Sequence, residues 1–148
     1  LVDHFLRRKV LRLEELRSRV NRTRPAPGRS VPNLQQVLRD RIPGYDPGES
    51  DLEARLARII IRAGLPAPTQ QHRVSYGPDR YRIDFAWPDR QLYLEGNGFG
   101  WHHLSTDLDK DAVRQNALVL DGWRPIELTW RMTDEFIEQT LRRFLLGV

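Results

Sequence analysis

Two acidic residues, Asp84 and Glu95, have the types and spacing best suited to chemistry, because one β-hairpin is expected to carry both. The segments 81–87 and 91–95 alternate between apolar and polar residues, which is typical of strands with one buried face. Pro88-Asp89-Arg90 lies between them and indicates a turn. The sequence therefore predicts a tight hairpin with one acid on each strand.

The apolar residues of this hairpin select its register. With Asp89-Arg90 as a two-residue loop, the facing pairs are Phe85 with Leu94, Trp87 with Leu92, Asp84 with Glu95, and Pro88 with Gln91. A shift by one residue would place the apolar partners on opposite faces of the sheet. Facing carboxylates have Cβ atoms roughly 5 Å apart and repel each other. A divalent cation between them would remove this repulsion, so the hairpin predicts metal-dependent chemistry.

The composition is that of one domain, or of one domain with an appendage, in a chain of 148 residues. The chain has no cysteine, no apolar run of membrane-spanning length and no signal peptide pattern. We therefore expect a soluble cytoplasmic protein without a membrane partner, a disulfide framework or a thiolate zinc site.

The positive charge is concentrated at the start of the chain. Residues 1–49 hold 11 Lys and Arg against 6 Asp and Glu, whereas residues 50–148 hold 13 against 14. Nearly all of the basic residues are arginines, which suit two-point phosphate contacts and suggest a nucleic acid as a partner. The alternative is a GC-rich coding sequence that scatters arginines over solvated faces.

A turn cluster at 45–49 divides the chain into a basic helical segment, 1–49, and a second domain, 50–148. Short helices are expected within 2–20 and 31–42, joined by a linker or basic loop at 21–30. The second domain has the predicted order α-β-β-β-α-β-α. Its elements are a helix opened by a capping box at Ser50, strands near 72–76, 81–87, 91–95 and 123–130, a helix at 106–120, and a final helix capped by Thr133.

This order, with an acid on the first helix and on the second and third strands, resembles the PD-(D/E)XK nuclease superfamily with its restriction-endonuclease-like core. The likeness is greatest to the branch related to the very-short-patch-repair endonuclease. The matching motifs are Ser50 to Glu53, 64–66, Ile83-Asp84-Phe85-Ala86-Trp87-Pro88, Glu95-Gly96-Asn97-Gly98 with His102, and Lys110-Asp111 with Arg114 and Gly122-Trp123. Relatives of this branch often follow a winged-helix region like that of antitoxins, so residues 1–49 are expected to be the tail of such an upstream domain.

The chain departs from the superfamily at its third motif. Asn97 stands where the superfamily has Lys and this branch has Asp, and Gly96 replaces a β-branched residue. Glycine in a strand is predicted to loosen it. The structural zinc of the repair endonuclease is not expected, because the chain has no cysteine.

The resemblance and the residue types together assign roles in catalysis. Asp84 and Glu95 are expected to ligate Mg²⁺, or Mn²⁺ as an alternative; Glu53 to position water or support the metal; His102 to orient water or protonate the leaving oxygen; and Asn97 to orient a water or phosphate oxygen. Structural alternatives stay open for four of them: an ion pair of Asp84 with Arg82 or Arg80, an exposed strand-end Glu95, a purely capping Glu53, and a surface His102.

Three further residues are expected to contact DNA: Arg82, Trp101 and Arg114. Asp111 is expected to lie behind the residues that contact metal or DNA and to hold them in position. Alternatively, Asp111 and Arg114 form a plain ion pair within their helix. Trp101 could equally be an aromatic that covers the core. We therefore expect a Mg²⁺-dependent deoxyribonuclease, and the alternative is a catalytically inactive DNA-binding or regulatory domain, antitoxin-like, that retains the nuclease fold.

Overall fold

The chain is a mixed α/β protein, as the sequence predicts. The computed structural model describes residues 1–24, 26–28, 30–97 and 105–147, without the side chains of 97 and 105–111. The elements are α1 (Val2–Arg7), α2 (Leu13–Arg22), α3 (Val31–Leu38), α4 (Asp51–Arg62), β1 (Thr69–Tyr76), β2 (Asp79–Trp87), a 3₁₀ turn (Pro88–Arg90), β3 (Leu92–Asn97), α5 (Ser105–Leu120), β4 (Arg124–Thr129) and α6 (Asp134–Leu146).

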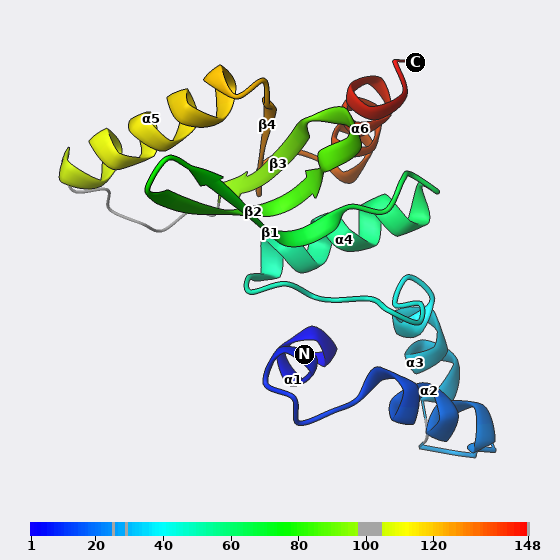
Figure 1. Cartoon of the computed structure of the whole chain (residues 1–148). Coiled ribbons are helices and arrows are strands. Elements are labelled where there is room, and N and C mark those ends of the chain that lie inside the picture. The colour runs from blue at the N-terminus through cyan, green and yellow to red at the C-terminus, as the bar shows by residue number, and fades with distance from the viewer. Residues whose placement is uncertain (25, 29, 98–104, 148) are drawn as a thin grey trace.

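The four strands form one sheet with the order β1-β2-β3-β4. The β1–β2 and β2–β3 pairs are antiparallel, and the β3–β4 pair is parallel. Parallel neighbours need a crossover connection, which α5 provides. In Figure 1, α4 lies on one side of the sheet and α5 on the other.

Apolar packing on both faces holds these layers together. The larger core joins α4 and α6 to the sheet through fully buried residues such as Leu56, Phe85, Leu94, Ile137 and Leu141. A smaller core beneath α5 contains Ile83, Ala86, Tyr93, Leu118 and Trp123.

The predicted register of the hairpin is confirmed for its apolar pairs, but its predicted turn is wrong. Phe85 pairs with Leu94 and Trp87 with Leu92. In place of a two-residue loop, Pro88–Arg90 forms the 3₁₀ turn, and Gln91 takes the left-handed conformation with φ of 50°. Proline cannot donate an N–H to a ladder, and the N–H of Gln91 instead bonds the carbonyl of Pro88 at 3.0 Å.

The N-terminal segment is helical, with a small core of its own made by Leu13, Val20, Val31 and Leu38. In Figure 1 its helices lie beyond α4, away from the sheet. Tyr45 packs against both this core and the larger one, so apolar contact continues across the predicted boundary at residue 49. None of the helices in the described ranges has the length and hydrophobicity to cross a membrane.

Candidate functional site

Asp84 lies where β2 is irregularly paired with both neighbouring strands. On one side, the ladder with β1 passes from Gln70–Phe85 to His72–Ile83 and omits the position of Gln71, whose φ is 51°. On the other side, the described ladder with β3 ends at Phe85–Leu94. The Oδ2 atom of Asp84 accepts a 3.1 Å hydrogen bond from the N–H of Gly96. The side chain is thus fixed against the backbone of β3 and is not paired with Arg80 or Arg82.

Glu95 forms a two-point ion pair with Arg114 of α5. Nη1 lies 2.7 Å from Oε1, and Nη2 lies 2.8 Å from Oε2. The two side chains are 20% and 25% exposed, so solvent screens this pair only in part. The cation that the hairpin predicts beside its acids is therefore supplied, at Glu95, by a guanidinium of the protein itself.

Glu53 is buried near the start of α4, where it closes the preceding turn. The helix is capped as predicted, because Oγ of Ser50 accepts the N–H of Glu53 at 3.1 Å. In a full capping box the Glu53 carboxylate would also accept the N–H of Ser50, but here it accepts hydrogen bonds from the N–H of Glu49 at 3.0 Å and from Nε2 of Gln71 at 2.7 Å. Gly48 makes this possible, because a Cβ there would lie 2.4 Å from Oε2 of Glu53.

The electrostatics link Asp84 with Glu53 and with the arginine that holds Glu95. Burial raises the pKa of Asp84 above its ordinary value, and the charge of Glu53 raises it further. The Gly96 N–H and the charges of Arg114 and Arg82 act in the opposite direction without cancelling the rise in pKa. Asp84 is therefore a carboxylate whose charge the surrounding protein does not fully compensate.

Gly96 lies against α4. A Cβ at this position would meet Cδ2 of Leu52 at 3.2 Å and Cδ1 of Leu56 at 3.5 Å. Glycine therefore lets β3 approach the first turns of α4, and this approach brings the Asp84–Gly96 bond close to Glu53. Gly96 thus has a packing role that the sequence did not indicate.

A further acid, Glu127, was not singled out in the sequence analysis. Its residue on β4 pairs directly with Glu95 on β3. Paired residues of neighbouring strands point to the same face, about 4.8 Å apart. The position of an acid within the predicted strand 123–130 was the only available signal, and it required knowledge of which strand lies beside β3.

The other predicted site residues are placed only in part. Arg82 forms a two-point pair with Glu49, with both N–O distances 2.7 Å. Asn97 ends β3 and Asp111 lies on α5, but their side chains are outside the described part of the structure. Trp101 and His102 lie outside the described residues altogether.

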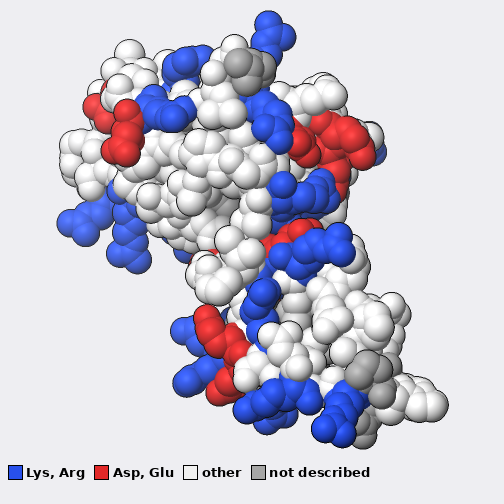
Figure 2. Space-filling view, turned by 90° about the vertical axis from the view of Figure 1, so that its right-hand side faces the viewer, with Lys and Arg blue, Asp and Glu red and all other residues white. Residues whose placement is uncertain are grey.

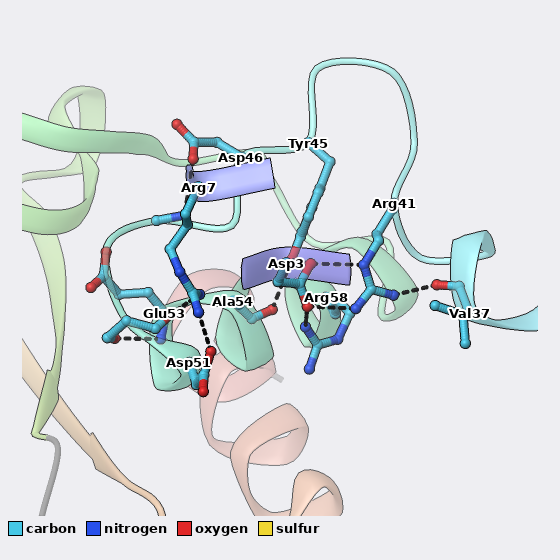
Figure 3. Close-up of polar contacts among 12 residues, drawn as sticks. Asp3, Arg7, Val37, Arg41, Tyr45, Asp46, Asp51, Glu53, Ala54 and Arg58 are labelled. Carbon is cyan, nitrogen blue, oxygen red and sulfur yellow. Dashed lines mark hydrogen bonds and ion pairs between the residues drawn. The ribbon is translucent and has the colours of Figure 1, made fainter. Parts of the chain in front are cut away.

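A buried ionic cluster joins the N-terminal segment to α4 (Figure 3), and sequence reasoning missed it. Asp3 accepts hydrogen bonds from Arg41 and from Tyr45 and Arg58, the last at 2.7 Å. Burial alone would raise the pKa of Asp3, but the bonds and charges of these partners outweigh it and hold the pKa below its ordinary value. Burial, then the charge of Asp3, raises the pKa of Tyr45 to about 12.

Charge is mixed over the molecular surface. On the face shown in Figure 2, basic side chains extend over both parts of the protein and are interspersed with acidic ones. Several arginines of the N-terminal segment have structural partners: Arg17, for example, donates to the carbonyls of Leu38 and Arg41. The net charge of residues 1–49 therefore overstates the number of arginine side chains that are available to contact a polyanion.

Carboxylate oxygens are the ligands that Mg²⁺ prefers, but most of those at this site already accept hydrogen bonds from the protein. Within the described residues, no group of three or more His, Asp and Glu side chains is arranged to hold a metal ion. Among the same residues, Oδ1 of Asp84 makes no hydrogen bond, whereas both oxygens of Glu95 bond Arg114. Asp84 therefore offers one free oxygen within the described residues, whereas ligation of a metal by Glu95 would require that Arg114 give up part of its contact.

Comparison with known proteins finds two similar sequences. They are the uncharacterized proteins MT2308 and Rv2248, from two strains of Mycobacterium tuberculosis, each 34% identical over 76 residues. That stretch is 51% of this chain and 28% of each relative, so the chain spans less than a third of their length. No protein-family model and no solved structure matches the chain.

Proposed function

We propose that residues 50–148 form a metal-dependent nuclease domain that hydrolyses phosphodiester bonds in DNA, with a PD-(D/E)XK core of the very-short-patch-repair type. The observation that carries this proposal is the position of Asp84 on β2, where its carboxylate is bonded to the N–H of Gly96 on β3 and lies within reach of the charge of Glu53 on α4. Asp84 retains a raised pKa at this point, and a partly buried carboxylate with a perturbed pKa is a candidate functional group.

Asp84 and Glu95 would hold Mg²⁺, or Mn²⁺ in its place. When bound, the metal would lower the pKa of a coordinated water and neutralise charge on the phosphate. Glu53 fixes the turn before α4 and adds negative charge beside Asp84. Arg82 and Arg114 present planar guanidinium groups, which suit two-point contacts to phosphate oxygens. In the proposed role, His102 and Asn97 orient the attacking water, Trp101 contacts the bases, and Asp111 supports Arg114.

A second candidate is a DNA-binding or regulatory domain that retains the fold without cleaving. The Glu95–Arg114 pair favours it, because the pair neutralises a predicted metal ligand without any metal. Asn97 favours it too, since an amide cannot act as a base or carry charge. In this candidate, residues 1–49 would connect the domain to an upstream winged helix.

Plasmid nicking and DNA binding, measured together, separate the two candidates. Supercoiled plasmid is incubated with wild type, Asp84→Asn and Asp89→Asn in Mg²⁺, in Mn²⁺ and in EDTA. Asp89 provides a matched control, because it lies exposed in the turn of the same hairpin. Metal-dependent nicking that Asp84→Asn abolishes and Asp89→Asn retains would support the nuclease.

Fluorescence anisotropy with a labelled duplex provides the second readout. Binding without nicking in either metal would support the inactive DNA-binding domain. Absence of both binding and nicking would contradict both candidates. The expected salt dependence is a linear fall of log affinity with log salt concentration, because phosphate contacts release counterions.

A further inference from the structure

We propose that Arg114 is an internal counter-ion that is exchanged for metal when DNA binds: it holds Glu95 in the free protein and moves to a phosphate group in the complex. This inference rests on the proposed function, because it describes how the same site would acquire its metal. It predicts that metal and DNA bind cooperatively.

The first support is the geometry of the pair. Both N–O distances, 2.7 and 2.8 Å, belong to a two-point contact, which is the strongest arrangement of guanidinium and carboxylate. A phosphate presents two oxygens in the same way, so it can replace the carboxylate without a change in the donor geometry. The pair thus stands in for a contact that DNA could supply.

The second support is the charge around Arg114. Its guanidinium bonds Glu95 and also acts electrostatically on Asp84. Glu127 is paired with Glu95 on the next strand and adds negative charge on the same face. A divalent cation at Asp84 and Glu95 would meet the positive charge of Arg114 at short range, so metal binding is opposed while Arg114 stays in place.

The third support is an unmet hydrogen bond. Within the described residues, the Nε atom of Arg114 is buried without a partner, although a buried donor is costly to leave unbonded. Nη1 adds only a long contact of 3.5 Å to the carbonyl of Arg82. The guanidinium is therefore well bonded to Glu95 and poorly bonded elsewhere, which leaves a second arrangement accessible to it.

The exchange balances charge. Before it, Arg114 neutralises Glu95; after it, Arg114 neutralises one phosphate while Glu95 and Asp84 share the divalent cation. By linkage, DNA must raise metal affinity by the same factor by which metal raises DNA affinity.

The test measures Mn²⁺ binding to the full chain by electron paramagnetic resonance of free Mn²⁺, with and without a short DNA duplex whose own Mn²⁺ binding is subtracted. The variants are Arg114→Gln, Arg114→Lys, and Arg143→Gln as a control that removes the same charge from an exposed position on α6. DNA is expected to raise wild-type Mn²⁺ affinity about tenfold, within the usual range of coupling between sites. Arg114→Gln is expected to bind Mn²⁺ about tenfold more tightly than wild type without DNA and to gain little from DNA.

Arg114→Lys, which keeps the charge but cannot form the two-point contact, should fall between these extremes. Equal Mn²⁺ affinity in Arg114→Gln, Arg143→Gln and wild type would overturn the inference and leave the proposed nuclease intact. A wild-type affinity that DNA does not change would also overturn it, and this arm does not depend on the folding of any variant. Failure of every protein to bind Mn²⁺, with or without DNA, would refute the proposed nuclease as well.

Discussion

The N–H of Gly96 donates a 3.1 Å hydrogen bond to Oδ2 of Asp84, just beyond the last described pair of the β2–β3 ladder. A side chain of β2, rather than its backbone, is thus bonded to β3 at this point. The bond fixes an acid on an inner strand of the sheet, while burial and the charge of Glu53 keep its pKa raised. A fixed acid with incompletely compensated charge is a source of instability, and this has measurable consequences.

Asp84→Asn is expected to stabilise the metal-free protein by on the order of 1 kcal/mol at neutral pH. Since the folded-state pKa of Asp84 is raised from 3.8, the folded protein binds this proton more tightly than the unfolded chain. The charge therefore lowers stability progressively as pH rises from that ordinary pKa through the raised one. Urea denaturation across this pH range should show a gain for Asp84→Asn that disappears in acid. Asp89→Asn is the control, and an equal gain there would argue against the role given to Asp84.

Asp3→Asn is expected to lower the free energy of unfolding by about 3 kcal/mol, because it leaves buried guanidinium groups without their anion. The side chains of Asp3 and Arg41 are 11% and 10% exposed. Asp51→Asn, at the same interface but with a side chain 73% exposed, should change stability by less than about 1 kcal/mol. Urea titrations of the three proteins check this difference, and equal losses would contradict a buried cluster.

The same cluster predicts acid sensitivity. The folded-state pKa of Asp3 lies below 3.8, so its contribution is complete above that ordinary value and is lost as pH falls through the lowered pKa. Lowering the pH should therefore loosen the contact of α1 with α4. Hydrogen exchange of the backbone amides in the two helices measures this loosening. Asp3→Asn should remove this part of the pH dependence; its persistence in the variant would assign it to another group.

Gly96→Ala is expected to destabilise the protein by about 1–3 kcal/mol, because the new methyl group would press on Leu52. A double-mutant cycle with Leu52→Ala tests the cause. Shortening Leu52 removes the atoms at 3.2 and 3.3 Å, so the alanine at 96 should be less harmful in that background. Strictly additive effects in urea denaturation would show that the strain arises elsewhere.

Tyr93→Phe is expected to leave stability unchanged or to raise it by up to about 1 kcal/mol. The hydroxyl of Tyr93 is buried and, within the described residues, makes no hydrogen bond. Tyr45→Phe provides the contrast, because its hydroxyl bonds Asp3 at 3.0 Å, and it should lose about 1 kcal/mol. Thermal melts of the two variants should move in different directions, and a clear loss in Tyr93→Phe would reveal a partner for its hydroxyl.

The sequence by itself determined the features that depend on neighbouring residues. The cap at Ser50 fixes the start of α4 through a bond across three positions, and the alternation places Phe85 and Trp87 together in the larger core, although β2 also buries Ile83 and Ala86 in the smaller one. The register of the hairpin followed as well, because a slip of one residue would expose the apolar pairs. The turn was mispredicted because Gln91 takes the left-handed conformation, which glutamine rarely adopts, so its residue type gave no indication of it.

The tertiary structure alone decided how the acids are neutralised. Glu95 and Arg114 are 19 positions apart, and Arg58 reaches Asp3 across 55 positions. Such pairs depend on how α5 crosses the sheet and how α1 meets α4, which are set by packing of whole apolar faces rather than by local spacing. From the sequence, a metal ion was the expected counter-charge for Glu95, whereas the fold brings an arginine to it.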